Sequence, residues 1–160
     1  MSSTHFSGPV VSTAGFTGDV TGDLTGNVTG LVGGAGLVKL SETVLYSAFT
    51  DGGAAVGTYD LTSGAVPIGA TFLYAAVTAV VGFAGDTSAV LTIGDGTDAD
   101  RYNTGTPSVF ATAANGVSVG APSGVLYHDA AKTIKLTVTT AADFTSVSAG
   151  SITIEYFYLT

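Results

Sequence analysis

The sequence contains no cysteine, and this absence excludes disulfide bonds and cysteine-ligated metal sites as sources of stability. Charge is also scarce, because 10% of the residues are charged, against about 25% in an ordinary soluble domain. Four residues are basic, they form no run, and the formal net charge is −8. These features argue against a nucleic-acid partner and against an anionic membrane surface. A surface this poor in charge tends to be buried against other molecules, so we expect the chain to work inside an assembly.

Long hydrophobic segments are missing as well. The most apolar run, Phe72 to Ala84, has 13 residues and is too short to span a bilayer. The N-terminal residues do not place a basic region before an apolar core, so we expect no signal peptide. We therefore expect a protein that is made in the cytoplasm and not exported.

What the sequence does contain is a regular repeat from Gly18 to Gly34, GDVTGDLTGNVTGLVGG. A helix over this span would carry a glycine at every fourth position, each costing about 1 kcal/mol, and a short helix has no such stability to lose. In an extended chain, side chains alternate between two faces. One face then carries threonine, aspartate and asparagine, and the other alternates an aliphatic residue with a glycine.

The repeat predicts an intermolecular element. A lone strand with such an apolar face is unstable in water, and other copies of the same chain supply matching glycine gaps. We interpret the segment as a stem of three intertwined copies. Its candidate residues are Gly18, Val20, Gly22, Leu24, Gly26, Val28, Gly30 and Val32. A flexible Gly/Thr linker is the alternative that the sequence leaves open.

Two parts follow from this reading of the chain. Residues 1–37 form an N-terminal arm and repeat, for oligomerisation and anchoring, and residues 38–160 form a β-sandwich. Terminal segments rich in Ser, Thr and Gly become ordered only when they dock on a partner. The candidate anchoring residues of the arm are Phe6, Pro9, Val10, Val11 and Phe16.

Short β-type runs alternate with turn clusters beyond residue 38. We predict strands at Glu42–Phe49, Val56–Leu61, Ala70–Val81, Ser88–Ile93, Ser108–Thr112, Gly124–His128, Lys132–Thr139 and Ser151–Leu159. One face of the seventh carries Ile134, Leu136 and Val138, and one face of the fourth carries Ala89, Leu91 and Ile93. Eight short strands without a helical stretch predict an all-β fold, an antiparallel, jelly-roll-like β-sandwich.

The last of these strands is apolar on both faces at its end. One face carries Ile152, Ile154, Tyr156 and Tyr158. Phe157 and Leu159 lie on the other face, and a strand that is apolar on both faces is covered on both. Phe157 and Leu159 are therefore candidate subunit-interface residues, with a covering loop of the same domain as the alternative.

Candidate catalytic and metal-binding residues are few. Gly116–Gly120 matches the G-x-S-x-G serine motif, but no strand–turn–helix corner is predicted there, and we interpret it as a β segment bounded by glycines. Asp95, Asp98 and Asp100 are a weak candidate for a Ca²⁺ site. The loop lacks EF-hand spacing, and we favour a solvated turn in which Arg101 pairs with one carboxylate. No cofactor fingerprint is present, so we expect no cofactor and no enzymatic activity.

Several motifs resemble a known family. Thr4–Pro9, followed by Gly15–Gly18 and the repeat, resembles the N-termini of virion proteins of tailed bacteriophages. Such arms occur in capsid decoration (cement) proteins, head fibres and tail-fibre modules. Gly57–Leu61, Val66–Ala70 and Leu91–Gly94 resemble the β-domain that follows those arms. The resemblance implies a homotrimeric virion protein with no catalytic residue to carry over.

Two functions are compatible with the resemblance. The first is a capsid decoration protein, made in the host cytoplasm, that binds the major capsid protein on the outer capsid surface and stabilises the shell. Other virion proteins are further candidate partners. The second is a tail-fibre or head-fibre tip that binds a host-surface glycan. Small size and the lack of a long shaft favour the first, and a hydrolase that uses Ser118 is a third, weaker hypothesis.

Overall fold

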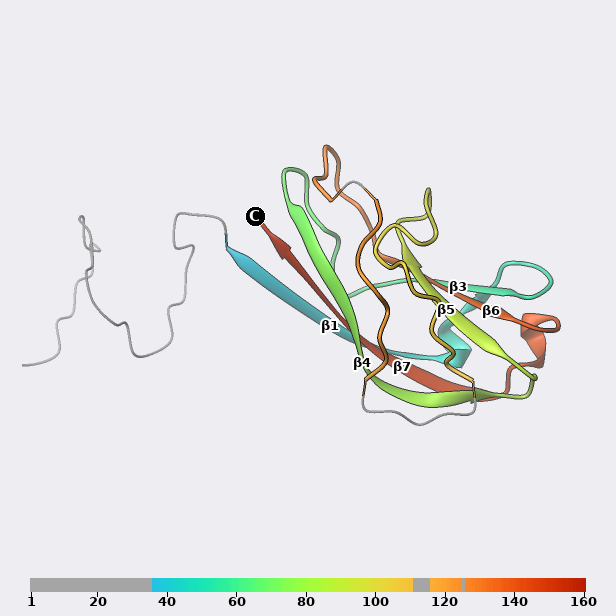
Figure 1. Ribbon diagram of the computed structural model, residues 1–160. Coiled ribbons are helices and arrows are strands. Elements are labelled where there is room, and N and C mark those ends of the chain that lie inside the picture. Colours follow the sequence, from blue (N-terminus) through green and yellow to red (C-terminus); the bar gives the residue numbers. More distant parts are fainter. Residues whose placement is uncertain (1–35, 111–115, 125) are drawn as a thin grey trace, which may run out of the picture. The chain divides into compact units, whose positions relative to one another are not determined.

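The computed structural model describes residues 36–110, 116–124 and 126–160 (Figure 1). The strands in these residues are β1 (Leu37–Leu45), β2 (Thr50–Asp51), β3 (Val56–Asp60), β4 (Thr71–Ala84), β5 (Ala89–Gly94), β6 (Lys135–Thr140) and β7 (Ala149–Leu159). Two short 3₁₀ turns, η1 (Tyr46–Ala48) and η2 (Phe144–Ser146), complete the regular structure. None of the described residues forms a helix with the length and apolar character of a membrane span.

The strands form two antiparallel sheets, in the orders β1-β7-β4 and β2-β3-β6-β5. In the first sheet, β7 is the central strand and pairs with β1 from Leu37↔Leu159 to Leu45↔Ser151. The expected all-β class with antiparallel sheets is confirmed. The jelly-roll-like connectivity stays a prediction.

The hydrophobic core combines buried side chains from both sheets. The strands β5 and β6 and the residue before β6 contribute Ala89, Leu91, Ile93, Ile134, Leu136 and Val138, and β7 contributes Ile152, Ile154, Tyr156 and Tyr158. The faces predicted for these three strands are confirmed. In these strands the apolar residues recur at every second position, so only one face of each strand can bury them all.

The long strand β4 departs from strict alternation. Its register against β7 shifts at three places, the first of them between Phe72 and Tyr74. A bulge inserts an extra residue and re-aims the side chains that follow it. Phe72 is therefore buried in the core, whereas Tyr74 keeps 44% of its surface exposed.

The prediction of a strand at Glu42–Phe49 is wrong at both ends. The strand β1 starts at Leu37, because it pairs along most of β7, and it ends at Leu45. The following residues, Tyr46–Ala48, form the 3₁₀ turn η1. This turn redirects the chain from β1 to the next strand, β2, which belongs to the other sheet.

Two more predicted strands, Ser108–Thr112 and Gly124–His128, are not regular strands in the residues that the structure describes. They pair there through isolated bridges, such as Phe83↔Phe110 and Thr71↔Tyr127 along β4. The register shifts of β4 are the physical reason, because bulges disrupt a continuous ladder. These two segments still cover part of the edge of β4, which would otherwise expose unpaired backbone groups.

The predicted arm and stem lie outside the described residues. This applies to the candidate anchors Phe6, Pro9, Val10, Val11 and Phe16 and to the candidate stem residues from Gly18 to Val32. The domain boundary after residue 37 stays a prediction. Leu37, which the sequence assigned to the arm, is the first residue of β1.

Candidate interaction surface

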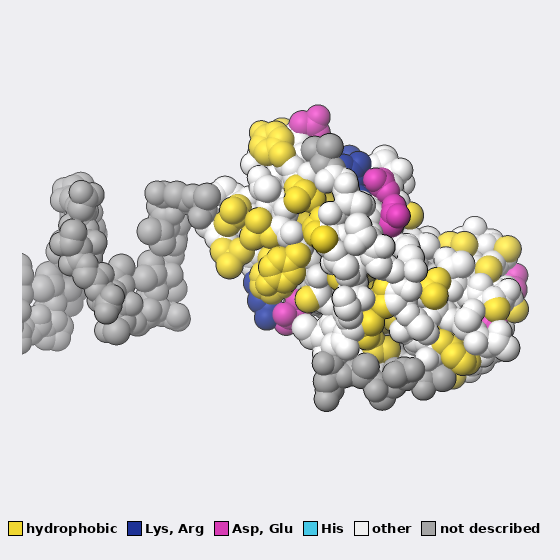
Figure 2. Space-filling model, viewed as in Figure 1, with side chains coloured by type: hydrophobic (Ala, Val, Ile, Leu, Met, Phe, Trp, Pro, Cys, Tyr) yellow, Lys and Arg dark blue, Asp and Glu magenta, His cyan; other side chains and the backbone are white. Residues whose placement is uncertain are grey.

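The outer face of the three-stranded sheet points away from the core, and the register sorts its side chains into cross-strand rows. From the start of β1 these rows are Leu37–Leu159–Thr71, Lys39–Phe157–Tyr74, Ser41–Glu155–Ala76, Thr43–Thr153–Ala79 and Leu45–Ser151–Val81. The first two rows hold Leu37, Tyr74, Phe157 and Leu159, which we call the apolar end. Figure 2 shows hydrophobic side chains gathered over this part of the sheet.

Two aromatic rings form the centre of the apolar end. The ring centroids of Tyr74 and Phe157 lie 4.3 Å apart, with an angle of 18° between the ring planes. Leu37, with 63% of its surface exposed, extends the surface along β1. Stacked rings and an aliphatic neighbour form a firm apolar surface of the kind found at interface cores.

One ion pair borders the apolar end. The Lys39 Nζ atom lies 2.7 Å from the Glu155 Oε1 atom and 5.8 Å from the centroid of the Phe157 ring. The two opposite charges neutralise each other on the same face of the sheet. The edge of the apolar end is therefore polar, but this ion pair gives it no net charge.

The structure brings the two predicted interface residues together. Phe157 and Leu159 lie on the outer face, where both are partly exposed. Their contact with another subunit stays a prediction. Sequence reasoning missed Leu37 because β1 was expected to start later, and it missed Tyr74 because the bulge in β4 breaks the alternation.

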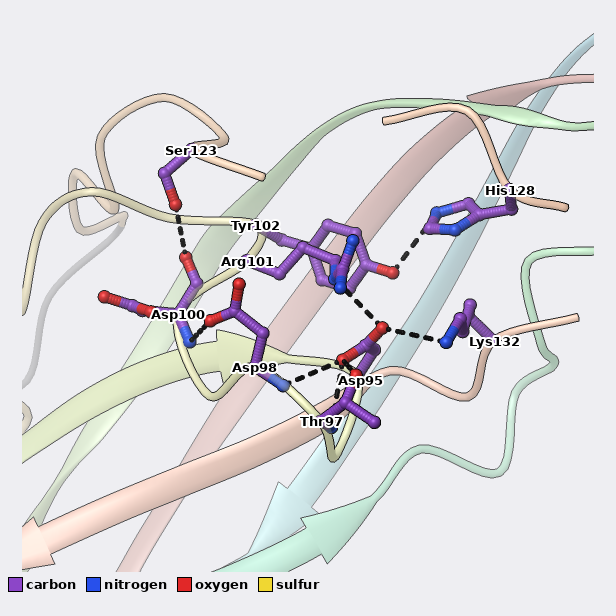
Figure 3. Close-up of polar contacts among 9 residues, drawn as sticks. All are labelled: Asp95, Thr97, Asp98, Asp100, Arg101, Tyr102, Ser123, His128 and Lys132. Carbon is purple, nitrogen blue, oxygen red and sulfur yellow. Dashed lines mark hydrogen bonds and ion pairs between the residues drawn. The ribbon is translucent and has the colours of Figure 1, made fainter. Parts of the chain in front are cut away.

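A second, polar cluster lies in the loop after β5 (Figure 3). The Asp95 Oδ1 atom accepts hydrogen bonds from the Thr97 backbone N–H (3.0 Å), the Thr97 hydroxyl (2.6 Å) and the Asp98 backbone N–H (3.1 Å). Its Oδ2 atom lies 2.9 Å from Arg101 Nε and 3.4 Å from Lys132 Nζ. Burial opposes ionisation of this carboxyl, but the hydrogen bonds and the charge of Arg101 outweigh it and lower the pKa of Asp95 to about 2.

The three aspartates of the Ca²⁺ candidate have separate roles. Asp95 faces two cations, and the Asp98 Oδ1 atom accepts a hydrogen bond from the Asp100 backbone N–H at 3.4 Å. Over the described ranges, no three His, Asp or Glu side chains gather as metal ligands would. Arg101 pairs with one carboxylate, as the turn interpretation expected, but the Asp95 side chain is fully buried and not solvated.

A cavity of about 330 Å³ lies beside this cluster and is lined by Arg101, Tyr127, His128, Asp129 and Lys132. The His128 Nε2 atom lies 3.2 Å from the Tyr102 hydroxyl in the protein interior. Burial, and after it the charge of Arg101, lowers the pKa of His128. The exposed ring of Tyr127 gives the cavity an aromatic wall that a ligand can reach.

The G-x-S-x-G match lies in irregular structure. Its Ser118 is exposed between Val117, which forms a single bridge with Val77, and the buried Val119. No helix follows this serine in residues 116–124, so the corner that such a nucleophile needs is not formed there.

No protein-family model and no curated protein sequence matches this chain. Among solved structures, it is similar to a chain of "Cyanophage Pam1 capsid asymmetric unit", with a TM-score of 0.52 and 16% sequence identity. The match covers 89% of this chain and 96% of that chain. At this identity the likeness shows a shared fold, and the coverage shows that the two chains are similar in length.

Proposed function

We propose that this chain is a non-enzymatic structural protein of a phage virion, a decoration protein that binds the outer surface of the capsid as a homotrimer. The observation that carries the proposal is the fold likeness to a chain from a cyanophage capsid asymmetric unit. Nearly all of both chains is covered, so a chain of this length and fold occurs in a capsid. The jelly-roll-like connectivity is part of the same proposal.

The proposed activity needs binding and no catalysis. A protein that binds the assembled shell and not the free subunits stabilises the shell by mass action, by about 2.7 kcal/mol per site at a hundred times the Kd. In this proposal Phe6, Val10, Val11 and Phe16 anchor the arm on the major capsid protein, and the repeat holds three copies together. The low charge of the chain supports a protein that buries much of its surface in an assembly.

Undecorated capsids test the proposal directly. We expect the purified full chain to co-sediment with such capsids and to raise the temperature at which they open. Replacing Phe6 and Phe16 by serine should abolish co-sedimentation, and Tyr127→Ala, far from the arm in sequence, should leave it unchanged. A full chain that never associates with capsids of its own phage would overturn this function.

A glycan-binding fibre tip is the second candidate, and the cavity next to Tyr127 is the observation that favours it. Tyr127 is 59% exposed, and Asp129 and Lys132 line the same cavity. An aromatic face with a few polar groups around it can bind a sugar ring and its hydroxyl groups. If this function holds, the full chain binds host cells or isolated surface glycan, Tyr127→Ala loses that binding, and undecorated capsids are ignored.

A further inference from the structure

The apolar end of the outer face presents the exposed side chains of Leu37 and Tyr74 beside the partly exposed Phe157 and Leu159. We infer that Leu37, Tyr74, Phe157 and Leu159 pack against the same residues of other copies, around the symmetry axis of the homotrimer. This inference rests on the proposed function for the trimeric state. It adds the face of the domain through which the copies meet.

The entry point of the N-terminal segment selects a second copy as the occupant. Gly36 and Thr160 exchange two backbone hydrogen bonds of 3.2 Å, which continue the pairing of β1 with β7 beyond Leu37 and Leu159. Thirty-five residues precede Gly36 in the sequence. Copies that meet through the apolar end therefore bring together the points at which their N-terminal segments join β1, as a shared stem requires. A contact with an unrelated protein would not explain this placement.

The charges around the apolar end also fit contact between copies. Lys39 and Glu155 pair within one copy at 2.7 Å, so no unpaired like charges from these residues meet at the axis. The apolar side chains supply an interface core, and the ion pair supplies part of a polar rim. The middle rows of the same face carry Ser41, Thr43 and Thr153 and offer no comparable apolar surface.

Cross-linking through an introduced cysteine tests the contact, because the natural chain has no cysteine that would compete. Leu159→Cys places a thiol in the apolar end, and Ser151→Cys places one on the same face of β7 at the opposite end. Both variants of the full chain are treated with a short bis-maleimide. We expect Leu159→Cys to form covalent dimers and trimers, and Ser151→Cys to form several-fold less. Equal cross-linking of the two variants, or none for Leu159→Cys, overturns the inference.

A charge substitution supplies a second measurement. Leu37→Asp and Leu45→Asp alter exposed leucines at the two ends of the outer face of β1, so neither change removes a core side chain. We expect Leu37→Asp to raise the concentration of half-dissociation of the trimer at least about tenfold, as loss of a buried interface contact does, and Leu45→Asp to leave it unchanged. Sedimentation equilibrium measures both values, and circular dichroism confirms folding. Equal effects of the two changes overturn the inference.

The possible outcomes separate this inference from the proposed function. A trimer that cross-links through Leu159→Cys but ignores capsids supports the interface and overturns the decoration function. A trimer that binds capsids but does not cross-link there supports the function and overturns the interface. A wild-type chain that is monomeric at all concentrations overturns the inference. So does a Leu159→Cys thiol that is protected from maleimide without cross-linking, because another occupant then covers the surface.

Discussion

The rings of Tyr74 and Phe157 stack across β4 and β7, with centroids 4.3 Å apart. Tyr74 reaches the outer face only because β4 carries a bulge between Phe72 and Tyr74. In a regular strand, residues two apart lie on the same face, and Tyr74 would then point into the core with Phe72. The bulge thus moves an aromatic ring from the interior to the surface, where it supports Phe157.

The stack predicts an energetic coupling between these two residues. In a double-mutant cycle of Tyr74→Ala and Phe157→Ala, we expect a coupling of about 0.5–1.5 kcal/mol, as for other aromatic pairs. Urea unfolding at one fixed protein concentration measures it, since oligomerisation makes stability depend on concentration. Val81→Ala and Phe157→Ala form the control pair and should be additive within about 0.5 kcal/mol, because Val81 lies at the other end of the face. A Tyr74–Phe157 pair as additive as the control pair would contradict the stack.

The sequence allowed prediction of the faces of β5, β6 and β7, because local alternation alone assigns them. It did not allow prediction of Tyr74, because a bulge depends on pairing with a strand more than seventy residues away. The predicted interface residues Phe157 and Leu159 were found from the same alternation. Leu37 joined them only when the register of β1 against β7 was known.

The ion pairs of Asp95 predict a stability loss when its charge is removed. Asp95→Asn leaves Arg101 and Lys132 without their shared carboxylate, and we expect a loss of about 2–3 kcal/mol, less than for a fully buried pair because both cations keep some exposure. Asp60→Asn is the matched control, because the Asp60 side chain is 59% exposed in its pair with Lys135, so the change should cost at most about 0.5 kcal/mol. Urea unfolding at pH 7 compares the two variants. Equal losses would contradict a special role for Asp95.

The low pKa of Asp95 predicts that the stability of the fold depends on pH. The pKa of this carboxyl in the folded state is about 2, below its ordinary value of 3.8, so the unfolded state binds the proton more readily. The stabilisation is therefore complete above about pH 4 to 5 and is lost as the pH falls towards 2. We expect the stability difference between wild type and Asp95→Asn to shrink over this interval. Glu42, Asp86 and Asp143, whose pKa values are also lowered, act equally in both proteins and cancel in the difference. A constant difference between pH 5 and pH 2.5 would contradict the low pKa.

The polar loop shows why a site is harder to predict than a strand face. The closeness of Arg101 to three aspartates in the sequence predicts that it pairs with one of them, but it does not select Asp95 as the partner. The contribution of Lys132 was not predicted, because it comes from a distant loop that only the fold brings within 3.4 Å. Burial of the Asp95 side chain follows from the same long-range packing, which is why a solvated turn was expected.

Gly57 in β3 predicts the effect of adding a single methyl group. A Cβ atom at this position would lie 2.3 Å from the Phe144 ring, which packs against Phe49 with ring centroids 5.9 Å apart. The ring would have to leave its position, so Gly57→Ala should cost about 1–3 kcal/mol, as other overpacked core substitutions do. Gly36→Ala is the control, because within residues 36–110, 116–124 and 126–160 its Cβ atom would meet only the Thr160 hydroxyl, at an ordinary 3.6 Å.

A second substitution tests whether the clash with Phe144 is the cause. Phe144→Ala alone removes a buried ring and should cost about 3–5 kcal/mol through the cavity that it leaves. In that background the added methyl group of Gly57→Ala no longer meets a ring, so it should cost almost nothing or recover part of the loss. Thermal and urea unfolding of the two single variants and the double variant measure this. If Gly57→Ala costs as much without the Phe144 ring as with it, the tight contact with Phe144 is not what requires glycine at this position.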